Sequence, residues 1–231
     1  MTTKFRVITA TRESRDGFFA NTALGHSLGL TARLLHPHVE LRLFPSNTSG
    51  LPRVYNIALR EAASDPAILI FIHDDVYLCD FFWPNQVLAG LERFDVIGVA
   101  GNKRRVPNQS AWNTVDEAGT WDDRQYLSGV VAHGQVFPPK PLWIFGPTCQ
   151  EVKLLDGLML IARSDTLLSR EVGFDERFDF HFYDMDFCRQ AESHNLRMGT
   201  WSISLFHMSL GGAGSPSWRE GYAKYLEKWK S

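Results

Sequence analysis

Cysteine is scarce in this sequence, and its three cysteines are not placed to pair with one another. Cys79, Cys149 and Cys188 lie far apart, are odd in number and form no Cys-x-x-Cys pair. This spacing excludes a disulfide framework and argues against a structural zinc site, which needs closely spaced pairs of ligands. We therefore expect a protein of a reducing compartment, most simply the cytoplasm.

Long apolar runs and a strong charge of one sign are also missing. No stretch approaches the roughly 20 apolar residues that a membrane-spanning helix needs, and the first residues show no signal-peptide pattern. The net charge of −2 argues against nucleic acid as a partner, because proteins that bind the phosphate backbone are normally basic. The 231 residues, 44% of them hydrophobic, suffice for one α/β domain with an ordinary core.

Apolar segments alternate with helical patterns along the first part of the chain. Strands are predicted at residues 5–10, 39–44, 67–72 and 96–100. Helices are predicted at residues 18–35, 53–63 and 86–93. This alternation predicts an α/β fold with a mainly parallel central sheet flanked by helices.

The pattern changes beyond residue 100. Residues 101–150 are rich in proline and tryptophan, and so long a segment without a regular pattern predicts a functional loop or a lid. A strand at residues 158–162, a short helix at 165–170, a helix beginning near residue 184 and a final helix from residue 217 follow.

One face of the final helix is aromatic, with the residues Trp218, Tyr222, Tyr225 and Trp229. Such a face suits either docking on the domain or peripheral contact with a membrane. We expect docking, because a globular domain rarely leaves several aromatic side chains exposed together.

Polar residues follow the ends of the predicted strands, which is where parallel sheets bind their ligands. They are Thr9, Thr11, Asn47 and the triplet His73-Asp74-Asp75. The adjacent carboxylates of Asp74 and Asp75 repel each other unless a cation is near. The doublet therefore indicates a divalent cation, Mg²⁺ or Mn²⁺, and an additional imidazole ligand would favour Mn²⁺. An acidic turn without function gives the same doublet, because Asp is common in turns.

A second acidic cluster lies at Asp184 and Asp186, near the start of a predicted helix. We assign Asp186 to capping of that helix and Asp184 to catalysis as a general base. His207 ends an apolar stretch and precedes a glycine-rich run, residues 211–215, which is a second candidate lid. Although a lone histidine is more often structural, this position at a strand end makes His207 a candidate metal ligand.

In this order, these elements resemble the family-2-like glycosyltransferases with the GT-A fold. The likeness is closer to the glycosyltransferase-like subgroup related to a streptomycin-biosynthesis protein. The segments that carry it are residues 51–58 (LPRVYNIA), 70–76 (IFIHDDV), 156–161 (DGLMLI), 173–176 (GFDE), 183–187 (YDMDF) and His207 with Gly211 and Gly212. Two departures stand out: His73 begins a motif that is commonly Asp-x-Asp, and Tyr183 replaces a common Glu before the base.

The resemblance implies one GT-A domain, with residues 1–102 as the nucleotide-sugar half and residues 103–231 as the acceptor-binding and catalytic half. It implies a metal-dependent, inverting transferase that moves a sugar from a nucleotide-diphosphate sugar, by family preference a UDP-sugar, to an acceptor hydroxyl. The implied donor-binding residues are Thr9, Thr11, Asn47, Arg53, Asn56, His73 and Asp74. Asp75 and His207 would hold Mn²⁺ or Mg²⁺, and Asp184 would be the base. Trp143, Asp156 and Tyr183 are the candidates for acceptor contact.

Several alternatives stay open at this point. Asn56 equally suits a hydrogen bond between its helix and a loop. The missing Glu favours a sugar-nucleotide-binding protein without transferase activity, whereas the retained Asp184 favours an enzyme. A nucleotidyltransferase is disfavoured, because residues 9–17 contain a single glycine where that chemistry usually needs a glycine-rich phosphate loop. The sequence names neither the acceptor, a sugar or a lipid-linked molecule, nor the oligomeric state.

Overall fold

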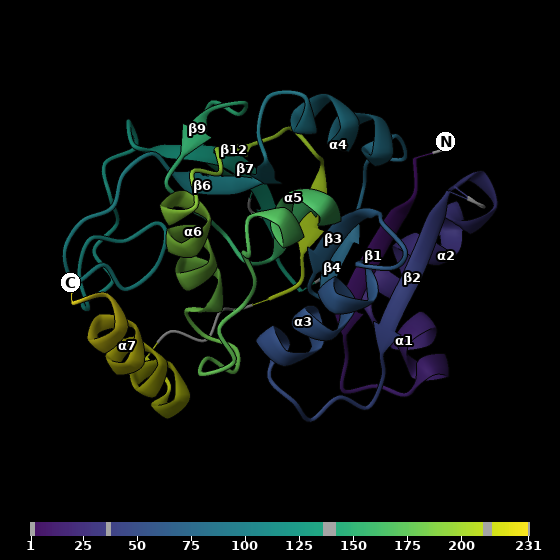
Figure 1. Ribbon diagram of the computed structural model, residues 1–231, viewed down its shortest axis with the longest axis horizontal. Helices are drawn as coiled ribbons and strands as arrows, with labels where there is room; N and C mark the ends of the chain where they lie inside the picture. The colour runs from purple at the N-terminus through teal and green to yellow at the C-terminus, as the bar shows by residue number, and fades with distance from the viewer. Residues whose placement is uncertain (1–2, 36–37, 136–141, 210–213, 231) are drawn as a thin grey trace.

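The computed structural model describes residues 3–35, 38–135, 142–209 and 214–230. Most of the glycine-rich run, including Gly211 and Gly212, and part of the proline-rich segment lie outside these ranges. Within the described ranges, no helix is both long enough and apolar enough to cross a lipid bilayer. Figure 1 shows the N-terminal strands and helices at one end of the molecule and the C-terminal helix at the other.

A seven-stranded sheet has the order β2–β1–β3–β11–β5–β12–β9. Its strands are β1 (Phe5–Ala10), β2 (Val39–Phe44), β3 (Ile68–Ile72), β5 (Val96–Gly98), β9 (Glu151–Val152), β11 (Met159–Arg163) and β12 (Met198–Thr200). β1, β2, β3, β5 and β12 run in one direction, whereas β9 and β11 run in the other. The mainly parallel sheet is therefore confirmed, and β3 is buried along its whole length, as its apolar sequence predicts.

A second sheet, which the sequence pattern does not predict, has the order β10–β6–β7–β13–β4, with β8 paired to β7. Its strands are β4 (Val76–Leu78), β6 (Ala100–Asn102), β7 (Leu127–His133), β8 (Leu142–Gly146), β10 (Leu154–Leu155) and β13 (Leu205–His207). The strand predicted at residues 96–100 is two strands, because the chain passes from one sheet to the other at Val99. The segment 101–150 is not a continuous loop, since it supplies most of β6 and all of β7 and β8.

The helices are α1 (Arg15–Asn21), α2 (Ala23–Leu35), α3 (Leu51–Glu61), α4 (Trp83–Leu91), α5 (Ser164–Ser169), α6 (Tyr183–Ser193) and α7 (Pro216–Trp229). The single helix predicted at residues 18–35 is divided at Thr22, where the backbone is extended. The Thr22 hydroxyl donates to Phe18 O at 2.8 Å and accepts from Gly25 N at 3.0 Å. It therefore closes α1 and caps α2. Gly25 permits this close turn, because a Cβ there would lie 2.0 Å from Phe18 O.

Helix α7 docks on the domain through its aromatic face, as expected from the sequence. Trp218, Tyr222 and Tyr225 are buried, and Trp229 packs against the core. α7 is held by α6, because the fully buried carboxylate of Asp186 accepts from Trp229 Nε1 at 2.8 Å and lies 2.6 Å from Lys228 Nζ. The capping role assigned to Asp186 is wrong, since this carboxylate bonds to α7 and the start of α6 has no side-chain cap.

The ion pair at this contact gives a first testable prediction. Lys228 Nζ lies 2.7 Å from Asp175 and 2.6 Å from Asp186, so Lys228→Ala leaves two carboxylates without their shared cation. We expect the free energy of unfolding to fall by about 3 kcal/mol, as for other broken buried pairs. Urea unfolding measures the loss. Lys224→Ala is the matched control, because its partner Glu220 is exposed and little change is expected; equal losses in both variants would contradict the assignment.

Candidate active site

Three side chains that could bind a cation meet at the junction of the two sheets. His73 follows β3, Asp75 precedes β4, and His207 ends β13, which pairs with β4. One potential ligand atom from each of the three lies within 4.8 Å of the other two. We call this group the His-Asp-His cluster. It includes the predicted ligands Asp75 and His207, and it adds His73, which the sequence analysis places with the donor.

Three polar atoms of the cluster lack the hydrogen bonds that buried groups normally make. Asp75 Oδ1 and His207 Nε2 lie 3.3 Å apart, but their geometry is not that of a hydrogen bond. Both atoms, together with His207 Nδ1, are buried and have no hydrogen-bond partner among the described residues. Such orphaned buried groups call for a missing partner. Two imidazoles and one carboxylate suit a divalent cation, and the nitrogen donors favour Mn²⁺ over Mg²⁺.

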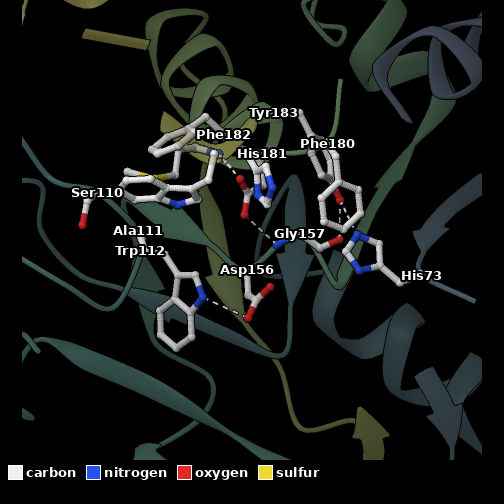
Figure 2. A pocket seen from close by; sticks show the side chains of 13 residues that line it. His73, Ser110, Ala111, Trp112, Asp156, Gly157, Phe180, His181, Phe182 and Tyr183 are labelled. Carbon is white, nitrogen blue, oxygen red and sulfur yellow. Dashed lines mark hydrogen bonds between the residues drawn. The ribbon is translucent and has the colours of Figure 1, made fainter. Parts of the chain in front are cut away.

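The predicted base lies in a neighbouring pocket of about 220 Å³, which we call the Asp184 pocket. It is lined by His73, residues 110–112, Asp156, Gly157, residues 180–185 and Trp218 (Figure 2). Asp184 lies in the first turn of α6, where Oδ2 accepts from Gly157 N at 3.0 Å and Oδ1 from Met185 N at 2.9 Å. Burial, followed by the nearby Asp156 carboxylate, raises the pKa of Asp184 to about 6. A carboxylate with this pKa is ionised at neutral pH and can accept a proton.

Two of the three candidates for acceptor contact, Asp156 and Tyr183, lie in this pocket and are fixed by hydrogen bonds. Asp156 accepts from Trp112 Nε1 at 2.9 Å and from Leu158 N at 3.0 Å. The Tyr183 hydroxyl lies 2.7 Å from Gly157 O and 2.9 Å from His73 Nε2, as the dashed lines in Figure 2 show. Tyr183 therefore connects the Asp184 pocket to the His-Asp-His cluster.

A second cavity, of about 490 Å³, lies at the ends of β1 and β2, and we call it the Asn47 hollow. It is lined by residues 10–12, residues 47–51, Asp74, Asp179 and Phe180. Phe180 also lines the Asp184 pocket, so the two spaces are adjacent. Three of the predicted donor residues, Thr11, Asn47 and Asp74, meet in this hollow.

The remaining predicted donor residues lie elsewhere. Thr9 is fully buried inside β1, and Arg53 is exposed on α3; neither is among the residues that line the hollow. Asn56 holds a loop to α3, because its side chain donates to Phe174 O at 2.8 Å and accepts from Phe174 N at 3.0 Å. This is the helix-to-loop bond that the sequence analysis left open.

Trp143 lies in an exposed aromatic group beside the His-Asp-His cluster and is not among the residues that line the Asp184 pocket. Its ring centroid is 5.1 Å from Trp121 and 5.3 Å from His133, and His133 is 5.3 Å from His207. Sequence reasoning missed His133, which the pairing of β7 with β13 places opposite His207. Like His207, His133 ends an apolar run, and this position could have identified it as a candidate site residue.

Arg12 and Phe180 were also missed as site residues. Arg12 lines the Asn47 hollow and an adjoining hollow that contains Asp74 and Asp75. Phe180 stacks on His73 with ring centroids 5.5 Å apart. The position of Arg12 in the loop after β1 was a usable signal, whereas nothing in the sequence distinguishes Phe180 from the other phenylalanines around Asp184.

Known proteins provide an independent comparison. The sequence matches the glycosyltransferase-like family over residues 45–204. No curated protein sequence matches the chain. Similar solved structures include S. aureus TarS residues 1–349 in complex with UDP-GlcNAc, with a TM-score of 0.50, 15% identity and coverage of 90% of this chain and 59% of that one.

Two further structures show the same fold. The mannosyltransferase PcManGT from Pyrobaculum calidifontis, in complex with GDP-Man and Mn²⁺, has a TM-score of 0.50 and 15% identity over 98% of this chain and 65% of that one. GalNAc-T7 with UDP, GalNAc and Mn²⁺ has a TM-score of 0.51 and 9% identity over 97% of this chain and 48% of that one. The chain thus spans less than two thirds of the length of each. Because the family match covers well over half of the chain, the protein belongs to the glycosyltransferase-like family and has the GT-A fold.

Proposed function

We propose that this protein is a metal-dependent, inverting glycosyltransferase that moves a sugar from a nucleotide-diphosphate sugar, preferentially a UDP-sugar, to an acceptor hydroxyl. One observation carries the proposal: His73 of the His-Asp-His cluster and the half-buried carboxylate of Asp184 line one pocket and are linked through Tyr183 and Gly157. Sugar transfer needs a cation site and a base close together, because the charge on the leaving diphosphate must be neutralised while the attacking hydroxyl loses its proton.

The donor is proposed to lie across the Asn47 hollow and the His-Asp-His cluster. Thr11, Asn47 and Asp74 would face the nucleoside, and Arg12 would face the diphosphate. His73, Asp75 and His207 would hold Mn²⁺ or Mg²⁺, which neutralises charge on the leaving diphosphate. This division assigns donor binding mainly to residues 1–102, although His207 comes from the second half of the chain.

The acceptor is proposed to enter the Asp184 pocket. Asp184 would remove the proton from its hydroxyl, and a single base on the face opposite the leaving group gives inversion. Trp112 and Asp156 would position the acceptor, and their mutual hydrogen bond fixes both side chains. Trp143 and Trp121 would extend the acceptor site along the surface, since aromatic faces suit the apolar faces of sugars.

Release of nucleoside diphosphate tests the proposal. The protein is incubated with UDP-, GDP- and dTDP-sugars and Mn²⁺, first with water as the only acceptor and then with candidate sugar and lipid-linked acceptors. Release of nucleoside diphosphate together with a glycosylated product supports a transferase. Binding without any release identifies a sugar-nucleotide-binding protein. Release of sugar 1-phosphate, which requires cleavage between the two phosphates of the donor, identifies a nucleotidyltransferase.

The pH profile of transfer should report the ionisation of Asp184. A base acts only when ionised, so kcat/KM should be level above pH 6 and fall about tenfold for each pH unit below it. Steady-state kinetics across pH with constant Mn²⁺ measure the profile. Asp156→Asn removes the neighbouring negative charge that raises this pKa, and should move the acidic limb to lower pH. An acidic limb that is unchanged in this variant would contradict the assignment.

A further inference from the structure

The two departures from the family pattern that the sequence shows are in direct contact. His73 and Tyr183 are 110 residues apart in the chain, yet His73 Nε2 lies 2.9 Å from the Tyr183 hydroxyl. One of them belongs to the His-Asp-His cluster, and the other immediately precedes the proposed base. The contact, which is drawn as a dashed line in Figure 2, therefore joins the two parts of the proposed reaction centre.

The hydrogen bonds around Tyr183 determine where the proton of His73 lies. The Tyr183 hydroxyl is 2.7 Å from Gly157 O, and a carbonyl oxygen has no proton to give, so the hydroxyl donates there. A phenol has a single proton, so its oxygen can only accept at the second contact, and His73 Nε2 must be the donor. The neutral imidazole then carries its proton on Nε2 and a lone pair on Nδ1.

The packing holds this arrangement in place. The Tyr183 side chain is 2% exposed, and its ring lies against Tyr55 and Phe174 at centroid distances of 5.9 and 6.1 Å. Residue 157 must be glycine here, because a Cβ would lie 2.6 Å from the Tyr183 hydroxyl and 2.8 Å from Asp184 Cβ. The same glycine donates its N–H to Asp184 and accepts from Tyr183, so one peptide segment fixes both side chains.

We propose that Tyr183 is a positioning residue that locks His73 in the Nε2–H tautomer and thereby makes Nδ1 the third cation ligand, with Asp75 and His207. This inference deepens the proposed function and rests on it for the cation. Hydrogen-bonded partners of ligand histidines fix both their tautomer and their orientation. The resulting donor set has two nitrogens and one oxygen, which selects Mn²⁺ over Mg²⁺.

The test compares Tyr183→Phe with Tyr55→Phe. Both changes remove one buried phenolic hydroxyl, but only that of Tyr183 is hydrogen-bonded to His73 among the described residues. Long-range ¹⁵N–¹H spectra of the metal-free protein should show His73 protonated on Nε2 in the wild type and in Tyr55→Phe, and a tautomer mixture in Tyr183→Phe. Binding of Mn²⁺ alone, followed by electron paramagnetic resonance, should be about 10- to 100-fold weaker in Tyr183→Phe and unchanged in Tyr55→Phe.

A double-mutant cycle separates positioning from a general loss of structure. In a His73→Ala background, Tyr183→Phe should cause no further loss of Mn²⁺ affinity, because the residue through which it acts is gone. Wild-type His73 protonated on Nδ1, unchanged Mn²⁺ affinity in Tyr183→Phe, or an equal loss in the His73→Ala background would each overturn the inference. If all three results are as expected and no nucleoside diphosphate is released from any donor, the inference stands and the proposed function fails.

Discussion

Asp184→Asn should lower kcat for sugar transfer by about 10²- to 10⁴-fold, the usual contribution of a general base. The substitution preserves the shape of the side chain and removes only the ability to accept a proton. Donor affinity should stay within about twofold of the wild type, because Asp184 faces the acceptor side and not the Asn47 hollow. Single-turnover kinetics measure the chemical step, and calorimetry with UDP measures donor binding.

Asp186→Asn is the matched control for this variant. It changes a carboxylate two positions further along the same helix, which bonds to Lys228 and Trp229. We expect lower stability but a nearly normal kcat per folded molecule. If Asp186→Asn abolished turnover in folded protein while Asp184→Asn had little effect, the two roles would be exchanged.

Asp75→Asn should weaken the binding of nucleoside diphosphate by at least about 100-fold, close to the effect of EDTA on the wild type. Asp75 is the only carboxylate of the His-Asp-His cluster, so its loss leaves two neutral imidazoles to hold a divalent cation. Without the cation, the diphosphate would lie beside Asp74 and meet repulsion. Calorimetric titration with UDP, with Mn²⁺ and then with EDTA, measures both effects.

Asp74→Asn is the control, because Asp74 lines the Asn47 hollow and lies outside the His-Asp-His cluster. This variant should keep a strong dependence on Mn²⁺ and lose less affinity than Asp75→Asn. Unchanged affinity for UDP in EDTA would remove the cation from the proposed mechanism altogether.

Regular periodicity made part of the fold predictable from the sequence. β1, β2 and β3 appear where their patterns place them, within about a residue, because β1 and β3 are buried apolar strands and the edge strand β2 alternates apolar and polar residues. The break at Thr22 was not predictable from periodicity, since it depends on the Thr22 hydroxyl bonding to both flanking helices. The second sheet escaped prediction because most of its strands are only two or three residues long, too short for a period to be read.

Site residues that directly follow a strand could be predicted from the sequence. Residues brought together by the pairing of distant strands were harder to predict. Asp75 and His207 were placed as ligands from their strand ends, and they are neighbours in the structure. His73 was assigned to the donor, because the sequence does not show that the following β4 belongs to the other sheet. His133 was missed because its nearness to His207 arises from pairing of β7 with β13, which no local pattern encodes.

Asp186 shows that the role of a side chain cannot always be predicted from its position in a helix. A carboxylate in the first turn of a helix is usually a reasonable capping group. Here, the deciding partners are Lys228 and Trp229, which lie more than forty residues further along the chain. The aromatic face of α7 was visible in the sequence, but the surface that receives it was not.

The wall of the Asp184 pocket can be completed only late in translation, because it includes a residue of the C-terminal helix. Trp218 is part of that wall, and Tyr222 donates to Asn108 O, in the segment that supplies Trp112. During translation β1, β2 and β3 can pair early, since domains begin to fold from their N-terminal parts. The Asp184 pocket cannot close until residues beyond 218 have been synthesised. A nascent chain can therefore pair β1, β2 and β3 long before the Asp184 pocket is complete, and the wall of that pocket closes only once α7 has docked.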